Sequence, residues 1–465
     1  MSAVRRALLC ALLVVGLMAA TAGSALAHAT LVGTTPAINS HIKESSSVVT
    51  LRFSEPIQIL NRGDVSIVDG RGVQVDNGAP RADGDRVFIT LKGPLVPSSY
   101  TVRYRVISAD SHAEASAYVF GVGNAKLGEP ILAGSGGLKD TSPMAIAARV
   151  VELVALGLLL GLIGFRMLVW GPAVERASDL DADERERALE HGQRLFWRTF
   201  WGLAVLAGVA ESLVLAAKSA VVFHTGIVSA AIHPTGTFRL VAASRFGDYL
   251  GWRSAALCAL VVVGFLTWTS ETGGLPSAGR RGAHALMGLL GVTALTMLAS
   301  QGHASQAPFA PLQIAADAAH LAGAAIWIGG LPCLAAVLLR APRALPEGGR
   351  SLASATLSTF SKIALWSVVV ISVTGLARML GELASPLQLV TTGYGRDLML
   401  KASLLAPILI LARRNRQMVA ALAGGLTPTT AKLKSVAKSV QMELAIAMGI
   451  VIVAALLVAQ IPGRG

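Results

Sequence analysis

Long apolar runs separated by short charged loops constrain this chain more than any other feature. A helix that crosses roughly 30 Å of hydrocarbon needs about 20 apolar residues, and the runs have that length. They lie at approximately 144–170, 196–217, 250–269, 282–300, 312–339, 357–380, 394–412 and 440–460. Residues 144–465 are therefore predicted to form an all-α polytopic membrane domain of about eight transmembrane helices.

Residues 1–27 have the three parts of a secretory signal peptide. Arg5 and Arg6 give it a basic start, an apolar core follows, and Ala25-Leu26-Ala27 is a small-x-small cleavage site. An uncleaved membrane anchor is the alternative. Cleavage after Ala27 would make His28 the first residue of the mature chain, and the domain that follows is then expected outside the cytoplasm.

Residues 28–125 have the pattern of a small β domain. Short β-branched and aromatic runs are separated by Gly, Pro, Asn and Asp, which is typical of a β-sandwich. The runs are LRFSEP, VSIVDG, RVFITLKG, YTVRYRVIS and SAYVFGVG. In the fourth run Tyr100 and Val102 are expected on one face and Arg103 on the other. The domain contains no cysteine, so it has no disulfide. Residues 126–143 are polar and contain Gly, Ser and Pro, which predicts a linker.

Three residues of this domain are candidate metal ligands. As a mature N-terminus, His28 would offer both an α-amine and an imidazole. Asp110 and His112 share one face if their segment is extended. Nitrogen-rich tetragonal sites suit Cu(II). An Asp-x-His pair taken alone is more often incidental than metal-binding, so the residues by themselves leave both interpretations open.

The first domain resembles the CopC family of periplasmic copper-resistance proteins. The resemblance rests on HATLVGTTPAINS, LRFSEPI and YTVRYRVISADSHAEASAYVFGVG, in this order. It implies a Greek-key sandwich of the cupredoxin/immunoglobulin-like kind, with Cu(II) bound by His28, Asp110 and His112. Glu55 is either a further neighbour of the metal or a strand-edge carboxylate. No Met lies between His28 and Pro143, so a Cu(I) site is not expected in this domain.

Charge in the loops predicts the orientation of the helices. The loops at 171–195, 270–281, 340–356 and 413–439 contain Lys or Arg, whereas those near 301–311 and 381–393 contain none. The positive-inside rule and the exported first domain agree on this topology, with the C-terminus outside the cytoplasmic (inner) membrane of a bacterium. The formal charge of +13 is explained by these loops, and no nucleic-acid partner is expected.

Polar residues inside membrane helices are costly and are therefore functional candidates. Glu152, Glu211, Asp317, His320 and Lys401 all lie within the predicted spans, in or near their outer halves. They could form a metal entry site. Alternatively, Glu152 and Lys401 form a buried pair, and His320 is an interhelical hydrogen-bond partner.

The second half of the chain resembles CopD, the inner-membrane partner of CopC. The matching segments are LASQGHASQ, DAAHLAGAAIWIGGLPCL, TGYGRDLMLKASLLAPILILARRNR and QMELAIAMGIVIVAALLV. The resemblance implies copper passage across the membrane, usually uptake. The copper candidates are then His303 and His320, supported by Asp317 and Met297, with Glu152 and Glu211 as further candidates on the path. Trp327, Gly329 and Gly330 are interpreted as close-packing residues.

The prediction is copper binding outside the membrane and copper transport across it, for homeostasis or resistance. The predicted partners are the copper ion, the lipid bilayer and other extracytoplasmic copper proteins. A membrane-anchored copper storage or sensing module and a di-haem redox protein are the alternatives. No enzyme is expected, because the chain has no GxSxG, HExxH or P-loop motif. The oxidation state that crosses the membrane, Cu(I) or Cu(II), and the direction stay open.

Overall fold

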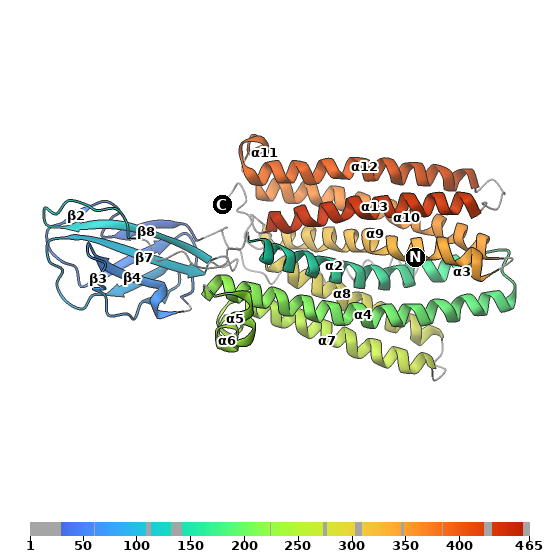
Figure 1. Cartoon of the computed structure of the whole chain (residues 1–465), viewed down its shortest axis with the longest axis horizontal. Helices are drawn as coiled ribbons and strands as arrows, with labels where there is room; N and C mark the ends of the chain where they lie inside the picture. Colours follow the sequence, from blue (N-terminus) through green and yellow to red (C-terminus); the bar gives the residue numbers. More distant parts are fainter. Residues whose placement is uncertain are drawn as a thin grey trace.

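The structure is a computed structural model of the whole chain. It describes residues 29–59, 61–107, 113–131, 142–223, 225–272, 277–302, 309–345, 348–383, 385–422 and 430–458. A β domain occupies one end of the molecule and a bundle of long helices the rest (Figure 1). The predicted division into two parts therefore agrees with the arrangement of the elements.

The β domain consists of two four-stranded sheets. One has the order β1-β3-β6-β5 and the other β2-β8-β7-β4. The strands are β1 (Leu31–Thr35), β2 (His41–Ile42), β3 (Val48–Phe53), β4 (Val65–Asp69), β5 (Arg81–Asp83), β6 (Arg86–Thr90), β7 (Ser99–Ile107) and β8 (Ala113–Val122). Strands distant in sequence are neighbours in both sheets, as a Greek-key arrangement requires. The predicted sandwich is confirmed, and all five quoted runs contribute strands.

Alternation along β7 produces the core of this domain. Tyr100, Val102 and Val106 are buried and belong to one hydrophobic cluster. Arg103 lies on the opposite face and donates to Ser66 Oγ at 3.1 and 3.2 Å. The period of two therefore assigned the faces correctly. The start of the predicted linker lies against the same strand, because Ile131 N donates to Thr101 Oγ1 at 3.2 Å.

The predicted apolar runs all lie in long helices, which extend beyond them at one or both ends. These are α2 (Pro143–Phe165), α4 (Ala182–Phe223), α7 (Arg245–Thr272), α8 (Ser277–Ser300), α9 (Ala310–Ala344), α10 (Gly349–Glu382), α12 (Gly393–Leu422) and α13 (Thr430–Val458). A π-helical turn η2 (Arg166–Trp170) joins α2 to α3 (Gly171–Arg176). The short helices α5 (Ile227–Ile232) and α6 (Pro234–Ala243) lie near the β domain, and α11 (Gln388–Thr391) precedes α12.

Seven helical segments of the described chain, rather than about eight, are long and apolar enough to cross a membrane. The exception is α12. Asp397 and Lys401 near its start and Arg413 and Arg414 further on leave too short a stretch without charge. It nevertheless packs beside α13 through the bundle (Figure 1). The predicted position of the C-terminus outside the membrane stays a prediction.

Glycines allow α2 and α9 to meet at the centre of the bundle. A Cβ atom added at Gly329 would lie 2.3 Å from Gly157 O, and one added at Gly161 would lie 2.5 Å from Ala325 O. Gly330 faces Phe360 of α10 in the same way, and Trp327 is buried. The interpretation of Trp327, Gly329 and Gly330 as close-packing residues is confirmed. Small residues permit this backbone approach in membrane helices.

Candidate functional site

The predicted Cu(II) ligands His28, Asp110 and His112 lie outside the described residues, so their metal binding stays a prediction. The residues that flank them are described. Ala29 is buried in the core of the β domain, and Ile107 pairs with Ala113 where β7 and β8 form a hairpin. The candidate ligands therefore follow or precede well-defined positions in the fold.

Residues 53–58 connect these flanking positions. Ser54 N donates to Thr30 O at 2.9 Å, and Thr30 N donates to Ser54 Oγ at 3.0 Å. At the other end of the segment, Gln58 and Ile107 exchange two backbone hydrogen bonds of 2.9 Å. One segment thus anchors both Thr30, two residues after His28, and the base of the hairpin. Glu55, at 3% exposure, lies within it, and a role for its carboxylate beside a metal stays a prediction.

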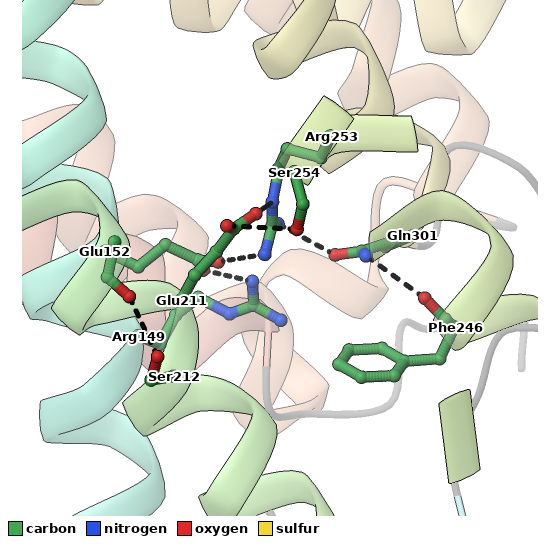
Figure 2. Close-up of polar contacts among 9 residues, drawn as sticks. Arg149, Glu152, Glu211, Ser212, Phe246, Arg253, Ser254 and Gln301 are labelled. Carbon is green, nitrogen blue, oxygen red and sulfur yellow. Dashed lines mark hydrogen bonds and ion pairs between the residues drawn. The ribbon is translucent and has the colours of Figure 1, made fainter. Parts of the chain in front are cut away.

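A buried ion-pair network joins α2, α4, α7 and α8 (Figure 2). Arg253 has no exposed surface, and its Nη2 lies 2.7 Å from Glu152 Oε1. Its Nε lies 2.8 Å from Glu211 Oε1. Arg149 pairs with the second oxygen of Glu152, and Ser254 Oγ donates to Glu211 Oε2 at 3.1 Å. The structure therefore brings Glu152 and Glu211 together around one arginine.

This network limits what the two carboxylates can do. Two arginines and two glutamates balance in formal charge, which makes the burial of Glu152 and Arg253 tolerable. A metal ion could use Glu152 or Glu211 only by displacing Arg253 or Arg149. The alternative pairing of Glu152 with Lys401 is wrong, because Lys401 instead interacts electrostatically with Asp317 and Glu382. Ligation of copper by Glu152 or Glu211 stays a prediction.

The network also holds the end of α8. Arg253 Nη1 donates to Gln301 Oε1 at 3.0 Å, and Gln301 Nε2 donates to the carbonyl oxygen of Phe246 at 3.4 Å. Gln301 is two residues before His303, which lies outside the described residues. Arg253 therefore fixes the position of Gln301, at the end of α8.

A second polar cluster lies between α9, α10 and α12. Arg378 Nη1 is 2.7 Å from Asp317 Oδ1, and Arg378 Nη2 is 2.9 Å from Glu382 Oε1. Tyr394 OH donates to Glu382 Oε2 at 2.5 Å, and Lys401 lies close enough to interact with both carboxylates. Asp317 is thus one member of a network in which each carboxylate has a cationic neighbour.

His320 and Asp317 both face α10, as their three-residue spacing on α9 predicts. Its Nδ1 is 3.1 Å from Ile371 O and 3.2 Å from Thr374 Oγ1, both on α10. These contacts agree with the alternative of an interhelical hydrogen bond, and they leave Nε2 for another partner. Met297 is buried on α8. No group of three or more His, Cys, Asp or Glu with metal-binding geometry occurs among the described residues.

Sequence reasoning identified the buried carboxylates but missed their partners Arg253 and Arg378. Both arginines lie within predicted apolar runs, 250–269 and 357–380. A charge at such a position requires a counter-charge, and this signal was present in the sequence. It could not say which carboxylate supplies the counter-charge, because the partners are distant in sequence.

Fold and site together define a multi-pass membrane protein with a small β domain at one end of its helical bundle. The CopC domain profile matches residues 31–123. The profile of the copper resistance protein D-like N-terminal domain matches residues 139–308, and that of copper resistance protein D matches residues 354–457. The chain therefore joins an N-terminal CopC domain to a CopD copper resistance membrane domain.

The copper transport protein CutJ of Bacillus subtilis (strain 168) is similar over most of this chain. It is 25% identical over 393 residues, which cover 83% of this chain and 67% of that protein. The match to the D-like N-terminal profile shows that the resemblance extends to the first helices, where the quoted motifs are looser. Asp317 and His320 lie between the two matched membrane ranges, so their roles depend on geometry rather than on the profiles.

Two solved structures are similar to a fifth of the chain. CopC from Methylosinus trichosporium OB3b has 25% identity and a TM-score of 0.19, and the match covers 22% of this chain and 98% of that one. PcoC, a methionine-rich copper resistance protein from Escherichia coli, has 23% identity and a TM-score of 0.18, with coverage of 21% and 100%.

Proposed function

We propose that this protein captures copper outside the cytoplasmic membrane and passes it through the helical domain into the cell. In this proposal the mature amino terminus and imidazole of His28 bind Cu(II) together with Asp110 and His112. The donor set is rich in nitrogen, which Cu(II) favours among the divalent metals. The matches to the CopC and copper resistance protein D profiles support copper as the cargo.

The packing of the β domain on the bundle carries this proposal. Ile107, at the base of the β7–β8 hairpin, is buried in one cluster with Ala148 of α2, Val214 of α4 and Phe246 of α7. The hairpin that bears Asp110 and His112 therefore starts directly above the helix ends. A donor domain tethered in this position meets its acceptor at high effective concentration.

Two histidines mark the proposed route from there. His303 follows the end of α8, which Arg253 and Gln301 hold beside Phe246. His320 lies ten residues after Ala310, the first residue of α9, or about 15 Å along the helix axis. That distance is about half the thickness of the hydrocarbon core. His303 thus suits entry and His320 suits a site near the centre, with Met297 and Asp317 as neighbouring supports.

No ATP-driven pump is built into the chain, since its sequence has neither a P-loop nor a DKTG motif. Copper movement would follow its gradient or that of another ion. Capture and transfer are separable steps in this scheme, and each has its own test.

Capture is tested by Cu(II) titration of the purified full-length protein, followed by electron paramagnetic resonance. The variants are an Ala inserted before His28, His112→Ala, and His41→Ala as a control on the same domain. His41 is exposed and bonds Ala125 O at 2.8 Å, away from the hairpin. The tetragonal nitrogen signal should be lost in the first two variants and kept in the third. Equal binding by all would remove the proposed site.

Transfer is tested by copper entry into vesicles that contain the protein with the β domain outward. His303→Ala and His320→Ala should each slow copper entry at least tenfold, because each removes a proposed ligand. His233→Ala is the control, since the His233 ring bonds Ser229 O within its own turn at 3.2 Å. Unchanged entry in both test variants would remove these histidines from the proposed route. No copper entry with the wild type would leave copper binding without transport, as a storage or sensing module requires.

A further inference from the structure

A cavity opens between α2, α4 and α9 at the end of the bundle away from the β domain. Its volume is about 510 Å³, which lies within the range of small-molecule sites. Arg166 and Trp170 of η2 contribute to one wall, Arg187 of α4 to another, and Arg340 of α9 to a third. The copper route proposed above does not include this cavity.

The charge of the cavity has one sign. Its lining includes Arg166, Arg187, Arg194 and Arg340 but no Asp or Glu. Arg187, His191 and Arg194 are exposed and lie at helical spacing on α4, so they form one stripe. Arg194 shares a loose 3.4 Å ion pair with Glu190, whereas Arg187 and Arg340 form no ion pair within the described part of the chain. The mouth is thus suited to an anion.

The deeper wall is apolar. Leu162 lies one turn before Arg166 on α2, and Phe165, Phe196 and Val337 also line the cavity. A ligand that fills the site would meet arginines at one end and hydrocarbon side chains at the other. A small hydrated anion would contact only the arginines.

Trp170 closes one side of the cavity. It is 91% buried, and Gly192 of α4 faces the indole so closely that an added Cβ would lie 2.6 Å from Nε1. Trp170 ends the π-helical turn η2, between α2 and α3. The indole and Gly192 thus pack η2 against α4 beside the cavity.

We propose that this cavity binds an anionic phospholipid, whose phosphate is held by Arg187 and Arg340 and whose acyl chain lies on the apolar wall. The cavity lies at the same end of the bundle as the Arg-containing loops that the orientation argument assigns to the cytoplasm. Basic pockets between helices on that side suit anionic headgroups. Such a lipid would bridge α2, α4 and α9 and stabilise their packing.

The test uses the full-length protein in a neutral detergent. Phosphatidylglycerol, phosphatidylcholine with the same acyl chains, and sodium phosphate are each titrated in. Native mass spectrometry counts bound lipid, and the thermal midpoint measures stabilisation. The variant R187Q/R340Q is compared with R198Q/R343Q, which removes the same charge from the same two helices. Arg198 and Arg343 are exposed and do not line the cavity.

Phosphatidylglycerol should bind and stabilise the wild type and R198Q/R343Q alike, and should bind R187Q/R340Q at least tenfold more weakly. Equal losses in both arginine pairs, or unchanged binding by R187Q/R340Q, would overturn the site. Stabilisation by sodium phosphate alone would identify a soluble anion instead of a lipid.

Discussion

Arg253→Gln is the change that most directly tests the buried network. It removes the cation shared by Glu152 and Glu211, of which Glu152 has no exposed surface. Loss of one partner from a buried ion pair costs about 3–5 kcal/mol. Arg149 and Ser254 still contact the two carboxylates after the change. We therefore expect a loss near the lower limit, about 3 kcal/mol in the free energy of unfolding of the bundle.

A double-mutant cycle separates the interaction from general disruption. Glu152→Gln removes one carboxylate but leaves Arg253 its contacts with Glu211 and Gln301. Residues in one ion-pair network couple by about 0.5–3 kcal/mol. The double variant Glu152→Gln/Arg253→Gln should therefore be less destabilised than the sum of the single variants, by about 1.5 kcal/mol.

Tryptophan fluorescence in mixed micelles with increasing sodium dodecyl sulfate is a suitable assay. All seven tryptophans lie between Trp170 and Trp366, in the helical domain, so the signal reports on the bundle and not on the β domain. Arg198→Gln, at an exposed site outside the network, should change stability by less than about 0.5 kcal/mol. Additive effects of the two network variants would refute the reasoning that Arg253 and Glu152 stabilise each other.

Three further predictions concern packing and the β domain. Gly329→Ala should destabilise the bundle by about 1–3 kcal/mol in the same fluorescence assay, whereas Gly157→Ala, whose added Cβ meets nothing within 4 Å, should not. Asp76 accepts from Ile67 N, Gly78 N and Gln74 Nε2 at 2.6–2.9 Å, so Asp76→Ala should speed amide exchange along β4, and unchanged exchange would contradict this role. Backbone hydrogen bonds from Val73 and Arg71 lower the pKa of Asp69. Its carboxylate therefore stabilises the fold at neutral pH, and this contribution is lost as the pH falls through the lowered pKa. Asp69→Asn should destabilise the β domain at pH 7 and match the wild type in strong acid, as measured by circular dichroism.

Local pattern was sufficient for most of the elements. Strands such as β7 follow from an alternation of period two, and spans such as α9 follow from length and hydrophobicity, because both signals are contained in neighbouring residues. The prediction of an eighth span at 394–412 overlooked how closely Asp397, Lys401 and Arg413 limit the uncharged stretch. The charge of Lys401 is tolerated because this residue has carboxylate neighbours on other helices. These neighbours are distant in sequence, so a local pattern does not reveal them.

The same distinction explains what was found at the site. Glu152, Glu211 and Asp317 could be identified because a carboxylate in an apolar run is costly wherever it lies. Their partners required the three-dimensional arrangement, since Glu152 and Arg253 are on α2 and α7. The proposed copper ligands of the β domain were predicted from residue chemistry and family resemblance. The fold adds that one segment, 53–58, anchors both of their flanking positions.

Phe246 connects the two halves of the proposed mechanism. Its side chain packs in the cluster that receives Ile107 of the hairpin, and its carbonyl oxygen accepts from Gln301, which Arg253 holds. The base of the hairpin that carries the proposed copper ligands and Gln301, two residues before His303, therefore both depend on Phe246. In the proposed mechanism, capture requires only the β domain, whereas transfer also requires the β domain and the helical domain to keep their relative positions. Loss of Arg253 should then slow copper entry and leave Cu(II) binding intact, a separation that direct ligands of the β domain cannot produce.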